Sequence, residues 1–336
     1  MHSNLPDGLI DVTNIKHAKE LMHDIVDNLQ KKLEAGIELP IKFLPEINDK
    51  LFGLKRKTLV TIGGRPSNGK SVFCLQLARS LAESDLKVHF FSLEMTRESC
   101  VERLLADIMS VNSRDIQNGQ VLNRKDFHQR MSQVNDILNK VQLTFSDSIG
   151  KNISEVEQVI KNMKGIDVVI IDYLQMCKGI GMQKREAIGE YVKRLRVLAI
   201  QKNVCIVLGS QINRGGGDGT MPTMNDLKSS GEIEEVSDQI IILHYPYFYS
   251  KDENEKGDYM IMVEKNRSGE TFVKKCGFIP EYSRIVEVES WRKERESKPK
   301  PKPTVNKPDP KPAEVPEVQQ FNRGFKTAHQ ISLSTT

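Results

Sequence analysis

Residues 63–71 read GGRPSNGKS, a glycine-rich stretch that ends in a lysine and a serine. Gly64 to Ser71 match the pattern GxxxxGK[ST] in full. The match lies directly after an apolar run, TLVTI (58–62), and directly before a helical pattern over 71–83. Glycines let backbone N–H groups curl around phosphate oxygens, and the N-terminus of the following helix adds positive partial charge. A match placed between a strand and a helix predicts a loop that binds nucleotide phosphates.

The pattern also gives individual residues a role. We expect Lys70 to meet the β- and γ-phosphates and the Ser71 hydroxyl to ligate Mg²⁺. ATP and Mg²⁺ are therefore the predicted cofactors. The predicted nucleotide-binding residues are Gly64, Arg65, Pro66, Ser67, Asn68, Gly69, Lys70 and Ser71.

Apolar strand-like runs alternate with helical patterns between about residue 40 and residue 292. The runs expected as buried parallel strands are 58–62, 88–93, 168–172 and 204–209. The helical stretches are 71–83, 97–109, 125–140, 153–164 and 184–202. The later runs 239–243, 259–265 and 272–279 come with short loops, so we expect them to extend one side of the sheet antiparallel. This alternation predicts an α/β fold with a doubly wound, mainly parallel sheet.

Three polar residues end strand-like runs. Asp172 closes VVIID, where a carboxylate can hold the water shell of Mg²⁺; the plainer alternative is a turn cap. Glu94 closes FFSLE, where it can polarise an attacking water. Gln211 closes VLGSQ and could sense the γ-phosphate, although a lone glutamine there is more often a surface residue. Because Tyr173 rather than a glutamate follows Asp172, the base must come from another strand, which favours a RecA-like P-loop NTPase over an AAA+ protein.

Composition excludes several classes of protein. The chain has 336 residues, of which 38% are hydrophobic and 28% charged, as in a soluble globular protein. It has neither an apolar run of about 18 residues nor the basic and apolar blocks of a signal peptide. Its five cysteines are scattered without a CxxC pair, so disulfides and a zinc site are not expected. A cytoplasmic protein, of a bacterium or of a phage-infected host, is predicted.

The two ends differ from the body. Residues 13–35 predict a helix that packs on its own domain or on a neighbouring subunit. Residues 299–312 hold six prolines and predict an extended, disordered tail that serves as a tether. Residues 293–336 carry the whole net charge of +4, so the body offers no bulk charge for nucleic acid. The predicted division is 1–39 (linker helix), 40–292 (ATPase domain) and 293–336 (tail).

Several blocks occur in a recognisable order: GRPSNGKS, FFSLEM, LTFSDSIGKNISEVE, VVIIDYLQM, GSQINR, DLKSSGEIEEVSD and EKNRSGE. Together they resemble the C-terminal ATPase domain of DnaB-family replicative DNA helicases over roughly residues 40–292. The resemblance implies a RecA-like hexameric motor that hydrolyses ATP at subunit interfaces, translocates on single-stranded DNA and unwinds duplex. It also implies that Glu94 is the catalytic base, Asp172 the Walker B residue and Gln211 the glutamine of the family's SQ motif.

The resemblance adds two further groups of residues. Lys265 and Arg267 match a finger that the family inserts into the neighbouring subunit's ATP site. Without the family they would read as two charges leaving an edge strand at a turn. Lys228, Ser229 and the Gly231 N–H match the DNA-contacting loop, although Lys and Ser here replace the family's Arg and Glu. The glycine-rich run 215–219 is either a loop at the same channel or a plain turn, and the basic helix 184–196 is a solvated helix or a DNA contact.

The expected partners follow from these assignments: single-stranded DNA, further copies of the chain in a hexameric ring, replication proteins reached through the tail, and no membrane. About 40 residues precede the ATPase domain, room for the linker helix but not for the family's N-terminal primase-interacting domain. Two other functions stay open, namely a RecA/RadA-like recombination ATPase and a DNA-stimulated ATPase scaffold without unwinding activity.

Overall fold

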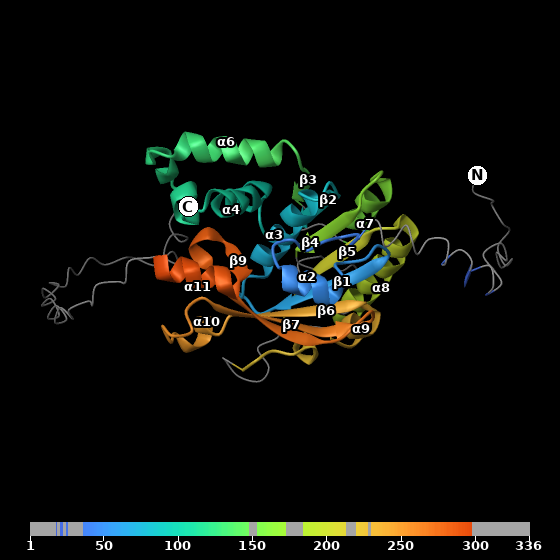
Figure 1. Cartoon of the computed structure of the whole chain (residues 1–336). Coiled ribbons are helices and arrows are strands. Elements are labelled where there is room, and N and C mark those ends of the chain that lie inside the picture. Colours follow the sequence, from blue (N-terminus) through green and yellow to red (C-terminus); the bar gives the residue numbers. More distant parts are fainter. Residues whose placement is uncertain are drawn as a thin grey trace, which may run out of the picture. The chain divides into compact units, whose positions relative to one another are not determined.

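The computed structural model describes residues 36–147, 153–172, 184–212, 220–227 and 230–297, together with Ala18, Leu21, Met22 and Ile25 (Figure 1). Apart from those four residues, the predicted helix over 13–35 lies outside the described residues. The same holds for the glycine-rich run 215–219, for Lys228 and Ser229, and for the tail from residue 298 onward. The division of the chain into 1–39, 40–292 and 293–336 stays a prediction.

The described residues form a nine-stranded sheet with the order β3-β2-β4-β5-β1-β6-β7-β8-β9. Pairing is parallel from β3 through β6 and antiparallel from β6 through β9. The strands are β1 (Thr58–Gly64), β2 (Lys87–Ser92), β3 (Gln142–Asp147), β4 (Val168–Asp172), β5 (Cys205–Gln211), β6 (Gln239–His244), β7 (Asp258–Asn266), β8 (Phe272–Ile279) and β9 (Arg284–Glu287). The predicted α/β fold with a mainly parallel, RecA-like sheet is therefore confirmed.

One predicted strand direction is wrong. The run 239–243, expected to be antiparallel, is the strand β6 and pairs parallel with β1, with Val60 opposite Gln239. A parallel neighbour needs a crossover connection, and here the 3₁₀ turn Met224–Asp226 and the helix α9 (Ser230–Val236) lie between β5 and β6. The other two late runs form β7 and β8, which are antiparallel as predicted.

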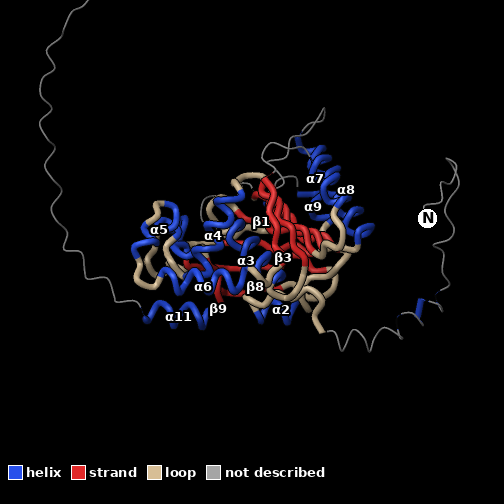
Figure 2. Tube along the Cα trace, turned by 90° about the horizontal axis from the view of Figure 1, so that it is seen from above, coloured by secondary structure: helices blue, strands red, loops and turns tan. Residues whose placement is uncertain are grey.

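Helices cover both faces of the sheet (Figures 1 and 2). The five predicted helices appear as α3 (Lys70–Ala82), α4 (Arg97–Met109), α6 (Phe127–Leu138), α7 (Ile153–Asn162) and α8 (Lys184–Lys202). Shorter helices that were not predicted are α2 (Pro45–Leu51), α5 (Ser113–Gln117), α9, α10 (Tyr247–Ser250) and α11 (Val288–Ser297), with 3₁₀ turns at Gln120–Asn123, Met224–Asp226 and Pro280–Tyr282.

The central strand β1 explains the two layers. Val60 and Ile62 point into one buried apolar cluster together with Phe73 and other side chains of α3. Leu59, which faces the opposite way, belongs to a second cluster that includes Val192 and Leu195 of α8. Successive strand residues alternate between faces, so an apolar run can fill both cores. Among the described helices, none combines the length and the apolar character that a membrane crossing needs.

Candidate active site

The phosphate-loop sequence forms a tight turn between β1 and α3. Gly69 caps α3 with φ 75°, and Ser67 also has a positive φ of 63°. This left-handed backbone turns consecutive N–H groups toward one side, which is how a loop cradles an anion. Glycine adopts this positive φ without strain, and a Cβ on residue 69 would also make a tight contact of 3.1 Å with the Tyr259 hydroxyl.

A buried asparagine fixes this loop in place. Asn68 has no exposed surface. Its Oδ1 accepts from Tyr245 N at 2.8 Å and its Nδ2 donates to the Tyr249 hydroxyl at 2.9 Å. Its carbonyl oxygen accepts from the Tyr259 hydroxyl at 2.6 Å. The loop is therefore held by residues that follow β6 or lie in β7, and the sequence had given no sign of these tyrosines.

The loop opens onto a cleft of about 290 Å³. Eight of the predicted site residues line it: Arg65, Pro66, Ser67, Gly69, Lys70, Ser71, Glu94 and Gln211. Two lining residues, Met95 and Arg103, were not predicted. Arg103 comes from the middle of α4, and no motif marks it in the sequence. Parallel strands end at a common edge, and there β1, β5 and β2 bring the loop, Gln211 and Glu94 to one opening.

Asp172 lies beside this cleft, at the end of β4. It is 3% exposed, and its Oδ1 is 3.9 Å from Lys70 Nζ. Among the described residues, Oδ1 has no hydrogen-bond partner. A buried carboxylate oxygen without a donor is costly unless a ligand supplies one, so the donor set of Asp172 and the Ser71 hydroxyl fits a Mg²⁺ ion with its water shell.

Glu94 is placed by a short turn after β2. Leu93 N donates to Asp172 O at 2.8 Å, which joins the ends of β2 and β4. Ser92 Oγ donates to Met95 O at 2.5 Å and accepts from Met95 N at 3.2 Å. The Glu94 carboxylate between these fixed residues is exposed on the cleft wall. It is therefore a carboxylate on a turn that backbone and side-chain hydrogen bonds hold in place, suited to orient a water molecule.

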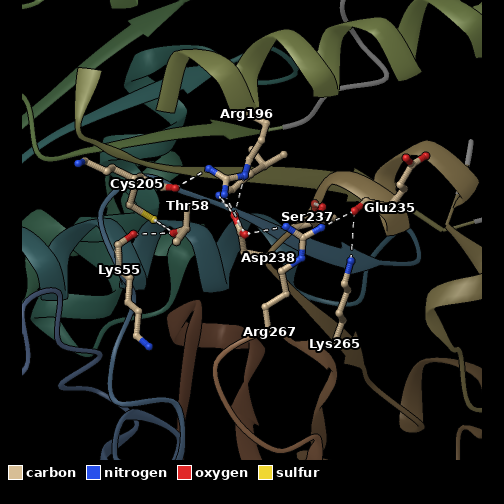
Figure 3. Close-up of polar contacts among 12 residues, drawn as sticks. Lys55, Thr58, Arg196, Cys205, Glu235, Ser237, Asp238, Lys265 and Arg267 are labelled. Carbon is tan, nitrogen blue, oxygen red and sulfur yellow. Dashed lines mark hydrogen bonds and ion pairs between the residues drawn. The ribbon is translucent and has the colours of Figure 1, made fainter. Parts of the chain in front are cut away.

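Lys265 and Arg267 do not join this cleft. They lie where β7 ends, and Arg267 Nη1 is 3.2 Å from Asp238 Oδ1 (Figure 3). The other oxygen of Asp238 accepts from Leu59 N, at the beginning of β1, whereas the phosphate loop follows the end of β1. Five residue steps from Leu59 to Gly64 span about 16 Å. The phosphate-loop residues therefore lie at the carboxyl ends of the parallel strands, and Lys265 and Arg267 lie at the opposite, amino ends.

The described part of the predicted DNA contact is small. Gly231 is exposed in the first turn of α9, and a Cβ there would meet no atom within 4 Å. Of the basic helix 184–196, Arg194 pairs with Glu157 and Arg196 pairs with Asp238. These two cations are engaged within the subunit, which reduces the positive charge that this helix offers to a nucleic acid.

Comparison with known proteins gives a consistent likeness. The family model described as a DnaB-like helicase C-terminal domain matches residues 41–287. The replicative DNA helicase DnaC of Bacillus subtilis (strain 168) is 28% identical over 285 residues, which cover 82% of this chain and 62% of that protein. The replicative DNA helicase DnaB of Leifsonia xyli subsp. xyli is 32% identical over 251 residues, which cover 72% of this chain and 54% of that protein.

Two solved structures share the fold. The ATPase domain of G40P has a TM-score of 0.74 at 24% identity, covering 82% of this chain and all of that one. A DnaB-like replicative helicase, whose interactions with primase were also described, has a TM-score of 0.72 at 23% identity, covering 81% and 67%. The chain spans about 62% of the length of the Bacillus relative.

Proposed function

The chain belongs to the family of DnaB-like helicase C-terminal domains, and we therefore propose that it is an ATP-driven DNA helicase. Its substrates are ATP and single-stranded or forked DNA. The motor is a ring of identical subunits, hexameric as the family resemblance implies, in which each ATP lies between two copies. It binds Mg²⁺ with the nucleotide and works in the cytoplasm, and the Pro-rich tail tethers replication proteins.

The residues of one copy supply the binding half of the site. The phosphate-loop N–H groups and Lys70 hold the phosphates, and Ser71 and Asp172 hold Mg²⁺. Bound Mg²⁺ neutralises negative charge on the phosphate oxygens. Glu94 orients and deprotonates the attacking water, and Gln211, which also lines the cleft, contacts the γ-phosphate. Arg103 also lines the cleft and adds a further contact to the nucleotide.

The main support for an ATP site shared between two copies is the separation of Arg267 from the cleft of its own copy. The Arg267 side chain is 48% exposed at the amino edge of the strands, and the cleft opens at their carboxyl edge. It therefore completes the site of another copy, where Lys265 and Arg267 stabilise charge that develops on the γ-phosphoryl oxygens. Lys228, Ser229 and the Gly231 N–H of each copy hold DNA phosphates in the ring channel.

Mixing two inactive variants tests the shared site. Arg267→Ala removes the finger and Lys70→Ala removes the phosphate contact, so each variant alone hydrolyses ATP poorly. A mixed oligomer contains sites built from an intact cleft and an intact finger, so DNA-stimulated ATP hydrolysis returns. As a matched control, Arg114→Ala, an exposed arginine on α5, keeps normal hydrolysis alone. Absence of recovery in doubly tagged mixed oligomers would overturn the shared site.

Strand displacement on a forked duplex tests the motor itself. The wild-type chain separates the strands with ATP and Mg²⁺, and Glu94→Gln does not. ATP hydrolysis that single-stranded DNA stimulates without any displacement would reject the helicase in favour of an ATPase scaffold. Open helical filaments on DNA in electron micrographs, in place of rings, would favour a recombination ATPase.

A further inference from the structure

Asp238 lies at the centre of a polar cluster at the amino edge of the sheet (Figure 3). It is 8% exposed and follows α9 directly before β6. Its Oδ2 accepts from Leu59 N at 2.9 Å and lies 3.0 Å from Arg196 Nε in an ion pair. Its Oδ1 accepts from Arg196 Nη2 at 3.1 Å and from Arg267 Nη1 at 3.2 Å. One carboxylate thus joins the central strand, α8 and the proposed finger.

The backbone around Asp238 is fixed as firmly as its side chain. Asp238 N donates to Leu59 O at 2.9 Å, and Arg267 N donates to Asp238 O at 2.9 Å. The preceding Ser237 is fully buried, and its hydroxyl is 2.8 Å from the hydroxyl of Thr61. The carboxylate is therefore held in a fixed position relative to β1, the strand that carries the phosphate loop at its other end.

The end of α9 holds the rest of the finger. Arg267 Nη2 donates to Glu235 O at 2.7 Å, and Lys265 Nζ donates to the carbonyl oxygen of Glu234. Carbonyl oxygens of the last helical turn have no partner in the helix and carry negative partial charge, so they suit cations. Arg267 is thus held at two of its nitrogens although about half of its side chain is exposed.

We propose that Asp238 is a positioning residue for the proposed finger: it fixes the Arg267 guanidinium in the orientation from which it enters the ATP site of the neighbouring copy. The proposal rests on the shared site proposed above. A long exposed arginine otherwise samples many rotamers, and side-chain conformational entropy is lost when it takes up one rotamer in the ATP site. A carboxylate fixed to β1 and balanced by Arg196 removes that freedom in advance, which lowers the barrier to hydrolysis without contacting ATP.

Steady-state kinetics give the first test. In Asp238→Asn the neutral amide holds the guanidinium more weakly, so kcat with single-stranded DNA falls by about tenfold or more while KM for ATP stays within about twofold. Ser237→Ala is the matched control, because it disturbs the same buried segment without touching Arg267. It lowers the unfolding temperature but reduces kcat far less than Asp238→Asn does, because the contacts of the Asp238 carboxylate with Arg267 and Arg196 remain. An equal fall in kcat in both variants would mean that the segment acts only through stability.

Mixed oligomers give the decisive test. Asp238→Asn subunits have an intact cleft, and Lys70→Ala subunits have an intact finger, so doubly tagged mixtures of the two regain hydrolysis well above either variant alone. If this mixture fails while Arg267→Ala with Lys70→Ala recovers, Asp238 acts within its own subunit and the positioning role is wrong. If neither mixture recovers, both the shared site and the positioning role of Asp238 are rejected.

A second variant covers the case in which Asp238→Asn does not assemble. Asp238→Glu keeps the charge and moves the carboxylate by one methylene group. It lowers kcat at constant KM for ATP and is rescued by Lys70→Ala subunits in the same way. Wild-type kcat in assembled Asp238→Glu oligomers would show that the exact place of the carboxylate is immaterial and would overturn the proposal.

Discussion

The Lys70 ammonium lies 3.9 Å from Oδ1 of Asp172, and the two side chains are 10% and 4% exposed. That oxygen has no hydrogen-bond partner among the described residues. Two nearly buried opposite charges at this distance attract each other, but the contact is too long to replace the hydrogen bonds that the Asp172 oxygen loses on removal from water. The pair is therefore arranged for a ligand that brings both negative phosphate and a cation.

Replacing Asp172 separates metal binding from nucleotide binding. Asp172→Asn removes the charge that attracts Mg²⁺, so we expect kcat to fall by about 100-fold or more. ATP still binds, but its affinity no longer rises when Mg²⁺ replaces EDTA; calorimetric titration measures this. Asp107→Asn, at a buried carboxylate paired with Arg79 and Arg284, is the control. It lowers the unfolding temperature and keeps the Mg²⁺ dependence.

Arg103 and Glu94 line one cleft but affect different kinetic constants. Arg103→Ala weakens ATP binding by about tenfold, the loss of one charge-assisted contact. Glu94→Gln keeps ATP affinity and abolishes turnover, because an amide cannot accept the proton of water. Fluorescent-nucleotide titration and single-turnover hydrolysis separate the two. Arg97→Ala, on α4 but paired with Asp147, changes neither; an effect as large as that of Arg103→Ala would contradict the assignment.

Gly231 allows a test of a backbone contact with DNA. Gly231→Ala keeps the N–H group and meets no atom within 4 Å, so affinity for single-stranded DNA stays unchanged. Gly231→Pro removes the N–H in the first turn of α9, where proline is tolerated, and lowers DNA affinity by about tenfold. Fluorescence anisotropy with an oligonucleotide measures both. Equal affinities of the two variants would exclude this N–H as a phosphate ligand.

His89 makes stability depend on pH. Its ring nitrogens lie 2.7 Å and 3.0 Å from the hydroxyls of Thr144 and Ser146, and burial lowers the pKa of His89 from 6.5 to about 4. Between these values the unfolded chain binds a proton that the folded chain does not. The free energy of unfolding therefore falls as pH decreases from 6.5 to 4, by at most about 1.4 kcal/mol per pH unit.

Urea denaturation between pH 7 and pH 4 measures this slope. In His89→Gln the amide keeps one donor and one acceptor but does not titrate, so its slope is shallower by up to one proton. Identical slopes for the wild type and His89→Gln would assign the acid sensitivity to other groups.

The central strands were predictable from the sequence, and the edges of the sheet were not. VVIID of β4 is buried throughout, so its continuous apolar run was unambiguous. QLTFSD of β3 is only half-buried at the edge of the sheet, and its mixed pattern hid a strand. The direction of β6 depends on its connection. Within the described part of that connection the α-helix is the seven-residue, acidic α9, which is too short to stand out as a helical period.

The same distinction holds for the site. Gly64, Glu94, Asp172 and Gln211 sit at or just beyond the ends of parallel strands, and such ends meet at one side of a sheet. Arg103 reaches the cleft from a helix face, where only tertiary packing decides which side chain arrives. The support of Asn68 by three tyrosines likewise joins segments more than 170 residues apart. No local pattern carries such contacts.

The opposite placement of the cleft and Arg267 on each copy has an arithmetic consequence under the proposed shared site. A lone subunit has one cleft and one finger but no complete ATP site. An open row of n copies has n − 1 complete sites. Only closure gives every copy a partner on both sides, which makes the count equal to n. Turnover per subunit then rises with assembly and falls on dilution, so the catalytic rate reports how many subunit interfaces have formed.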